Sequence, residues 1–251
     1  MNRIWINFKR WFIEMGSPPL FYKWSSKLVP WFCGLALITL FIGLYWGMFL
    51  APTDYKQGDV YRILFIHVPS AILGQSIFMF MAICGFINVI WRAKISGMML
   101  KSAAPIGMSF TLLALVTGSV WGKPTWGTWW VWDARLTSTL ILFFIYAALL
   151  GLHSTIDDKT KADRAVSILS IVGLAIIPVI KKSVDWWQTL HQPSTFTITS
   201  APSMSPEMYL PLLLCLVGFY LFFAFSLTLN LRNEVIDRER SKRWVKQLFD
   251  T

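Results

Sequence analysis

Histidine is rare in this chain, and its placement points to metal-binding chemistry. The three histidines are His67 in RILFIHVPSA, His191 in SVDWWQTLHQPSTF, and His153. Imidazole is a common ligand of metals, haem iron included. A lone histidine is more often structural, so we interpret His153 as a structural or interface residue. His67 and His191 come from distant parts of the chain, and the predicted spans place both on one side, beside aromatic rings. That favours shared ligation.

The second distinctive feature is a tryptophan-rich segment, WGKPTWGTWWVWDARLT, at residues 121–137. An aromatic belt at a membrane interface explains an isolated tryptophan, but it requires only one or two rings at a helix end. Gly122, Pro124 and Gly127 predict that no helix continues through this segment. We therefore expect a compact loop whose rings offer a flat apolar platform to a flat apolar ligand. Five of the 14 tryptophans lie here: Trp121, Trp126, Trp129, Trp130 and Trp132.

Three charged residues near these groups are candidates for anchoring or for ligand binding. We expect Asp133 to form a local ion pair that anchors the loop to the next span. Arg135 has a second possible role, because a guanidinium binds carboxylates through two hydrogen bonds. Arg62 is a similar candidate, and an anchor at the membrane interface is an equally good explanation for it.

Other chemistries find no support in the sequence. Residues 118–124, GSVWGKP, have one residue too few before Gly-Lys and no Ser or Thr after it, so they are not a P-loop. Any dependence on ATP must therefore come from a partner. The three cysteines, Cys33, Cys84 and Cys215, are far apart in apolar stretches and predict neither a disulfide framework nor a zinc cluster.

The elements that must position these residues are transmembrane helices. The chain has 251 residues, of which 55% are hydrophobic and 14% charged, against about 25% charged in a typical soluble domain. Because about 20 apolar residues span the hydrocarbon, and its interior forces backbone groups to pair within a segment, we predict an all-α protein. Its six transmembrane helices lie roughly at 28–50, 62–91, 102–120, 137–153, 164–180 and 208–230.

The distribution of basic residues predicts the orientation of these spans. An even number of spans puts both termini on one side, and 17 of the 23 Lys and Arg residues fall on that side. The positive-inside rule therefore places both termini in the cytoplasm and puts the Trp-rich loop, His67 and His191 on the outer, periplasmic side. We divide the chain into a cytoplasmic interfacial amphipathic segment (1–27), a six-helix membrane domain (28–230) and a basic cytoplasmic tail (231–251).

Four segments resemble the CcmC family of cytochrome c maturation, within the wider WWD group of haem-handling membrane proteins. They are PPLFYKW at 18–24, HVPSA at 67–71, the Trp-rich segment, and WWQTLHQ at 186–192. The resemblance covers essentially the whole chain. It implies that the protein holds haem b at the periplasmic face of a bacterial inner membrane. It also implies covalent attachment of that haem to the haem chaperone CcmE, with CcmD and the ATP-dependent CcmA and CcmB as further partners.

By the family motif, His67 and His191 are the axial ligands of the haem iron, and the Trp-rich segment with Arg135 completes the site. We expect the five tryptophan rings to pack on the porphyrin and Arg62 and Arg135 to pair with the propionates. The resemblance therefore implies a haem chaperone or transfer protein rather than a free-standing enzyme. Two alternatives stay open: a transmembrane haem conduit within an ABC-type exporter complex, and a structural subunit whose Trp loop binds a protein or a quinone.

Overall fold

The described part of the chain folds into one bundle of helices. The computed structural model describes residues 16–187, 189–191 and 204–249, so residues 1–15 of the predicted interfacial amphipathic segment lie outside it. Six of its helical segments are long and apolar enough to cross a membrane, as the sequence predicts. Within the described residues no strand forms, and the single isolated β-bridge joins Asp54 to Gly58.

The six spanning segments follow the predicted order, and most extend beyond the predicted ends. The last one, for example, continues past Asn230 and takes in the first residues of the predicted tail. Their bounds are α2 (Pro18–Tyr45) continued by η1 (Trp46–Leu50), η2 (Asp59–Ile63) continued by α3 (Leu64–Trp91), α4 (Lys94–Trp126), α5 (Ala134–Thr155), α6 (Lys159–Gly173) followed by α7 (Ile176–Trp186), and α8 (Pro206–Glu239). A short helix, α9 (Arg243–Phe249), follows α8.

The helix of the Trp-rich segment is longer than the sequence predicts. We expected Gly122 and Pro124 to end it, and this expectation is wrong, because α4 continues through both to Trp126. A single glycine costs a helix only about 1 kcal/mol, and a proline close to the end removes one backbone hydrogen bond. Gly127 ends the helix instead: its φ of 78° is left-handed, and its N–H donates to the carbonyl of Lys123 at 3.1 Å.

The fifth span, predicted as one helix, is two helices. α6 ends at Gly173, and α7 starts at Ile176 after a turn in which Leu174 and Ala175 donate to carbonyls three residues earlier. The close approach of α3 explains the small residue here, because a Cβ on Gly173 would lie 2.8 Å from Cζ of Phe78. The break lets α7 take its own direction along α5.

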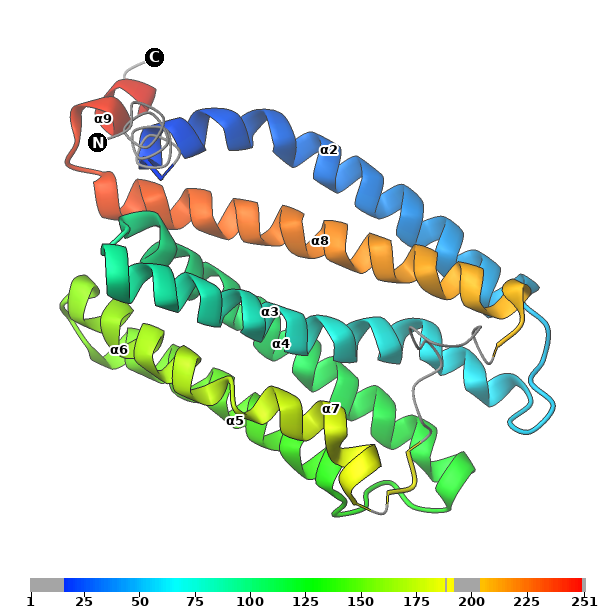
Figure 1. The fold of residues 1–251 in the computed structure, drawn as a ribbon. Helices are drawn as coiled ribbons and strands as arrows, with labels where there is room; N and C mark the ends of the chain where they lie inside the picture. The colour runs from blue at the N-terminus through cyan, green and yellow to red at the C-terminus, as the bar shows by residue number, and fades with distance from the viewer. Residues whose placement is uncertain (1–15, 188, 192–203, 250–251) are drawn as a thin grey trace, which may run out of the picture.

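α3 and α4 form the centre of the bundle. α2 and α8 pair on one side of them, and α5, α6 and α7 cover the other side (Figure 1). Tyr146 of α5 is fully buried in this core, and its hydroxyl donates to the carbonyl of Gly74 in α3 at 2.8 Å. Gly107 of α4 makes room for that ring, because a Cβ there would lie 2.3 Å from the Tyr146 hydroxyl.

A buried network of charges joins three helices at the end of the bundle where the last helix of the chain lies. Arg238 of α8 donates to both carboxylate oxygens of Asp163 in α6, at 2.5 and 2.9 Å, and to Glu234 at 2.5 Å. Lys101 of α4 pairs with the other oxygen of Glu234 at 2.7 Å. Two cations and two anions balance, so the network fixes α4, α6 and α8 relative to one another without a net buried charge.

Loss of the central cation of this network is predicted to destabilise the bundle strongly. Arg238→Met leaves two carboxylates buried without their main partner, and breaking a buried pair in this way costs about 3–5 kcal/mol. Thermal unfolding in detergent, followed by circular dichroism, should show the loss. Lys242→Met, which removes an exposed cation from the same end, is the control and should change stability by less than about 0.5 kcal/mol. Equal losses in the two variants would contradict a stabilising network.

Candidate functional site

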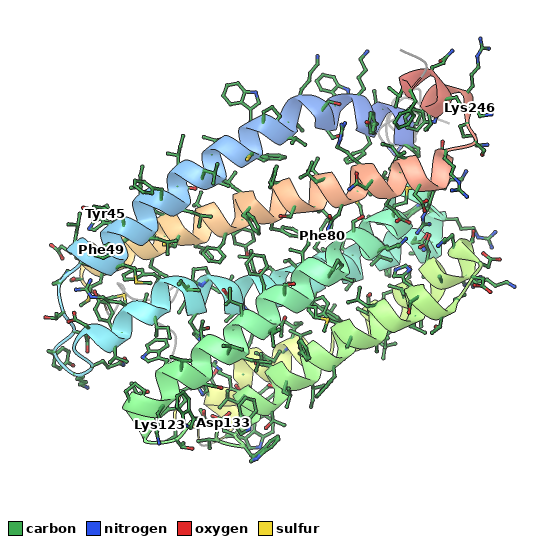
Figure 2. The ribbon with its side chains drawn as sticks, turned by 180° about the vertical axis from the view of Figure 1, so that it is seen from behind. Tyr45, Phe49, Phe80, Lys123, Asp133 and Lys246 are labelled. Atoms are coloured by element: carbon green, nitrogen blue, oxygen red, sulfur yellow. The ribbon has the colours of Figure 1, made fainter. Side chains whose placement is uncertain are left out.

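The candidate site lies at the opposite end of the bundle. Figure 2 shows Lys123 and Asp133 at the end that also holds Tyr45 and Phe49, far from Lys246. Here the first turn of α3 carries His67, the last turns of α4 carry two tryptophans of the Trp-rich segment, and the connection after α7 carries His191. Elements that are distant in sequence therefore meet around the predicted ligands.

The imidazole of His67 is held by α4. Its Nδ1 lies 3.0 Å from the Thr117 hydroxyl, whose single proton already goes to the carbonyl of Leu113 at 2.6 Å. Nδ1 must therefore carry the ring proton and donate to Thr117, which leaves a lone pair on Nε2. Gly118 lies so close to the ring that a Cβ there would come within 2.9 Å of its Cε1 atom.

The imidazole of His191 is held in the same tautomer by a carboxylate. Its Nδ1 lies 3.1 Å from Oδ2 of Asp133. The lowered pKa of Asp133 keeps this carboxylate ionised, so it can only accept a hydrogen bond. Nδ1 of His191 therefore donates, and its Nε2 keeps a lone pair. The Thr189 hydroxyl donates to the same carboxylate oxygen. Asp133 is also the N-cap of α5, since its Oδ1 accepts from the backbone N–H of Leu136 at 2.8 Å.

The electrostatics of this pair keep the histidine neutral and the carboxylate charged. Burial lowers the pKa of His191, and nearby Arg135 lowers it further, which outweighs the opposite effect of Asp133. Burial alone would raise the pKa of Asp133, but hydrogen bonds from Thr189 and from the Leu136 N–H, together with His191, bring it below its usual value. At neutral pH the site therefore presents a neutral imidazole, which is the form that binds a metal.

One tryptophan of α4 lies against each histidine. The rings of Trp121 and His67 meet edge to face with their centroids 5.6 Å apart, and those of Trp126 and His191 with centroids 4.9 Å apart. Trp121 is oriented by the first connection, because its indole N–H donates to the side-chain oxygen of Gln57 at 2.8 Å. Each candidate ligand therefore has an aromatic neighbour whose position is fixed by the backbone of α4.

The other three tryptophans of the segment lie beyond the end of α4. Trp130 and Trp132 contact each other edge to face, with centroids 5.5 Å apart. The indole N–H of Trp130 is buried and has no hydrogen-bond partner among the described residues. Trp129 and Trp132 are 58% and 75% exposed, so their rings face outward.

Arg135 and Arg62 differ in the number of hydrogen bonds that their guanidinium groups make within the described residues. Arg135 makes one weak hydrogen bond, from Nε to the Ser183 hydroxyl at 3.3 Å. The local ion pair that we expected for Asp133 is not formed with Arg135, because capping of α5 and contact with Thr189 and His191 occupy its carboxylate.

Arg62 holds the end of the first span in place. Its guanidinium donates to the backbone carbonyls of Gly47 and Ala51, at 2.9 and 2.8 Å, and pairs with Asp59 at 3.0 Å. These carbonyls belong to the π-helical turn η1 and its C-terminal residue. Arg62 therefore anchors η1, a role that the sequence did not reveal.

Sequence reasoning missed the polar residues that orient the ligands. Thr189 precedes His191 by two residues, and Thr117 lies one turn before Trp121 on the same helix, so their spacing offered a weak signal. Gln57 offered none, because it contacts Trp121 only through the folding of the first connection.

The pair of histidines, His67 and His191, suits a metal ion whose other ligands come from a cofactor. Among the described residues, no group of three or more His, Cys, Asp or Glu side chains could hold a metal ion. Two imidazoles with fixed Nδ1–H groups are compatible with a haem iron, because the porphyrin supplies four nitrogens and leaves two axial positions. The aromatic neighbours suit the porphyrin face.

Comparison with known proteins places the chain in a family. A family model named CcmC and described as Heme exporter protein C matches residues 11–246. The chain belongs to the CcmC family. It is 41% identical over 242 residues to the Heme exporter protein C of Haemophilus influenzae, covering 96% of this chain and 98% of that protein. The Escherichia coli K12 protein of that name is 42% identical over 236 residues, covering 94% and 95%. That of Bradyrhizobium diazoefficiens is 43% identical over 226 residues, covering 90% and 86%.

The electrostatics of the CcmC-family site predict a pH dependence of stability. The pKa of His191 is below its ordinary value of about 6.5 in the folded state, so the unfolded chain takes up its proton first as the pH falls. The free energy of unfolding should therefore decrease below about pH 6.5, until the folded-state pKa is passed. The stabilisation from Asp133, whose pKa is lowered, is lost only at more acidic pH, below about 4.

Thermal unfolding midpoints between about pH 7.5 and 5.5 test this prediction. His191→Gln should flatten the slope, and Lys182→Gln, which removes an exposed cation of α7, should leave it unchanged. Identical slopes for the parent and His191→Gln would show that His191 does not take up a proton differently on unfolding.

Proposed function

We propose that this protein binds haem b at the Trp-rich end of the bundle and presents it for covalent attachment to the chaperone CcmE during cytochrome c maturation. The observation that carries the proposal is that His67 and His191 have the same tautomer. Each donates from Nδ1 to a fixed acceptor and keeps a lone pair on Nε2. Such outer hydrogen bonds orient metal-bound histidines and raise their basicity. The shared name of the relatives, Heme exporter protein C, supports haem as the cargo.

The aromatic residues would hold the macrocycle. Trp121 and Trp126 lie beside the two imidazoles, so a porphyrin ligated by both histidines has a ring against it near each ligand. The indole N–H of Trp130, which has no acceptor among the described residues, would donate to a polar group of the cargo or of the acceptor protein. The exposed rings of Trp129 and Trp132 extend the apolar platform outward.

The propionates need cationic partners, because charge near hydrocarbon is costly. Arg135 is the better candidate, since its one hydrogen bond within the described residues, to Ser183, is long, and its neighbour Asp133 bonds to His191. Arg62 spends three of the five N–H donors of a guanidinium on Asp59, Gly47 and Ala51. Its pairing with a propionate stays a prediction.

Presentation follows from the position of the site at one end of the bundle. Haem supplies the iron and the reactive porphyrin edge, and the protein supplies binding, orientation and release. We place this end in the periplasm of a bacterium, with the protein in the inner membrane, because the basic residues concentrate at the other end. CcmD, CcmA and CcmB would be its partners, and ATP hydrolysis would belong to that complex.

The ligand assignment predicts the spectrum of the purified protein. His67→Ala and His191→Ala should each abolish or shift the low-spin absorption spectrum of bound haem, because each removes one of two axial nitrogens. His153→Ala is the control, since His153 lies in the last turn of α5 at the other end of the bundle, and it should retain the parent spectrum.

Parent spectra in both His67→Ala and His191→Ala would refute ligation by the pair. Haem uptake into sealed vesicles by this chain alone would instead support the conduit alternative. A haem-free protein, even in complex with its partners, would support the structural-subunit alternative.

The role of Asp133 can be separated from folding. Asp133→Asn keeps an N-cap for α5, because asparagine caps as well as aspartate, but it removes the charge that faces His191. Haem affinity should fall about 10–100-fold, as for other outer-shell partners of metal ligands, and the reduction potential should rise. Asp185→Asn, which removes an exposed carboxylate of α7, should alter neither. Unchanged affinity and potential in Asp133→Asn would contradict the orienting role.

A further inference from the structure

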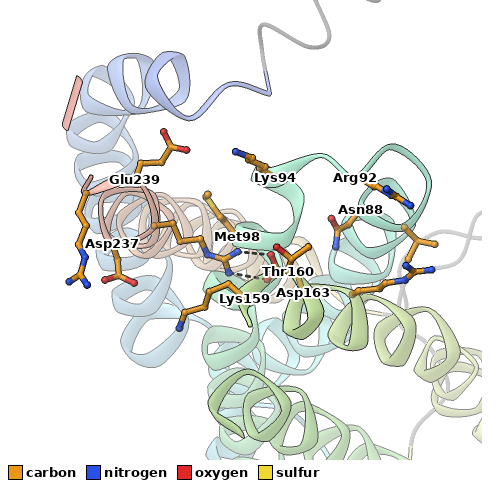
Figure 3. A pocket seen from close by; sticks show the side chains of 13 residues that line it. Asn88, Arg92, Lys94, Met98, Lys159, Thr160, Asp163, Asp237 and Glu239 are labelled. Carbon is orange, nitrogen blue, oxygen red and sulfur yellow. Dashed lines mark hydrogen bonds and ion pairs between the residues drawn. The ribbon is translucent and has the colours of Figure 1, made fainter. Parts of the chain in front are cut away.

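A cavity lies at the end of the bundle opposite the histidines. Its volume is about 630 Å³, and it is lined by the last turn of α3, the first turns of α4 and α6, and the end of α8. Figure 3 shows Asp163 near the middle of the lining residues, with Lys94 and Arg92 above it. Nothing in the proposed haem chemistry uses this cavity.

The lining of this cavity is strongly cationic. Six of its side chains are Lys or Arg, and three are acidic. Arg238 and Asp163 bind each other, and Glu239 accepts a hydrogen bond from the indole of Trp244 at 3.0 Å. No carboxylate within the described residues pairs with the five remaining cations, which are Arg92, Lys94, Lys159, Arg164 and Arg240. Asp237 and Glu239 also line the cavity, so cations from three separate segments converge on one space with more positive than negative charge.

The apolar surface beside the cavity indicates the rest of the ligand. Val89 and Met98 belong to its lining. Along α3 below it, Ile83, Phe86 and Ile90 are exposed by 60%, 54% and 52%. Their spacing of three and four residues puts them on one face of the helix. A cationic cradle that continues into an exposed apolar stripe suits an amphiphile with an anionic head, rather than a fully water-soluble anion.

The level of the cavity along the bundle agrees with this reading. α3 ends at Trp91, which is 59% exposed, and Arg92 and Lys94 follow directly. Tryptophan followed by basic residues is the sequence that marks a cytoplasmic membrane interface. Phosphate headgroups lie at this depth, and basic pockets between helices on the cytoplasmic side bind anionic headgroups.

We propose that this cavity is a binding site for the phosphate headgroup of an anionic phospholipid, whose acyl chains lie along the exposed face of α3. The lipid would join the ends of α3, α4, α6 and α8 from outside, next to the buried network of Asp163, Glu234, Arg238 and Lys101. It would neutralise cations that otherwise repel one another.

Titration of the purified full-length chain in neutral detergent tests the ligand. Phosphatidylglycerol should raise the thermal unfolding midpoint by at least about 5 °C at saturation, whereas phosphatidylcholine should leave it unchanged. Inorganic phosphate alone is the third arm, and it should give no comparable shift. A full shift with inorganic phosphate would overturn the lipid assignment in favour of a soluble anion, and no shift with phosphatidylglycerol would overturn the site.

Paired variants locate the effect. Arg92→Gln with Arg164→Gln removes two unpaired exposed cations of the cavity. Each such charge contributes about fivefold, so half of the shift should require roughly 25-fold more phosphatidylglycerol. The control, Lys161→Gln with Arg243→Gln, removes two exposed cations that belong to the same end but not to the cavity, and it should stay within about twofold. Equal weakening in both pairs would show diffuse attraction to surface charge and would refute the site.

If one of these variants fails to fold, a second measurement on the parent protein still tests the proposal. Mass spectrometry of the intact parent protein should show phosphatidylglycerol retained in preference to phosphatidylcholine from an equimolar mixture. Lys94→Gln with Lys159→Gln, drawn from the same cavity, should lose that preference. Equal retention of the two lipids by the parent would overturn the proposal.

Discussion

The carboxylate of Asp133 holds together the parts on which the candidate site depends. It caps the first turn of α5, and it receives hydrogen bonds from Thr189 and His191 in the connection after α7. Without this carboxylate, the hydrogen bonds that join the start of α5 to Thr189 and His191 would be lost. Because the charge also selects the tautomer of His191, one side chain sets both the architecture of this end and the chemistry that it can perform.

α4 has the same organising role for the first histidine. Thr117 and Gly118 fix the ring of His67, and one and two turns later Trp121 and Trp126 meet the two imidazoles. The continuation of α4 through Pro124 is what makes this possible. A loop starting at Gly122, as the sequence predicts, would leave Trp126 without a rigid support. The aromatic part of the site is therefore half helix and half connection.

The two ends of the bundle differ in the charge that they present. At the histidine end, burial keeps the imidazole of His191 neutral, and hydrogen bonds occupy the carboxylate of Asp133 beside it. At the other end, cations exceed the acids around the cavity, and one balanced network lies buried beneath them. A bundle with this asymmetry can hold a neutral metal ligand set at one surface and an anionic headgroup at the other.

The sequence by itself determined the class of fold, the order of the six spans, and the residues whose types suit the ligand. Hydrocarbon length and backbone pairing leave few options for such an apolar chain, and His67, His191 and the five tryptophans stand out by composition alone. The sequence offers three helix breakers for the end of α4, and the structure selects Gly127 through a local left-handed cap. The break between α6 and α7, the partners of Asp133 and the hydrogen bonds of Arg62 were decided only by the tertiary structure. These three depend on contacts between segments far apart in the chain, such as Phe78 with Gly173 or Arg62 with Gly47, and no local pattern encodes which distant backbone will be near.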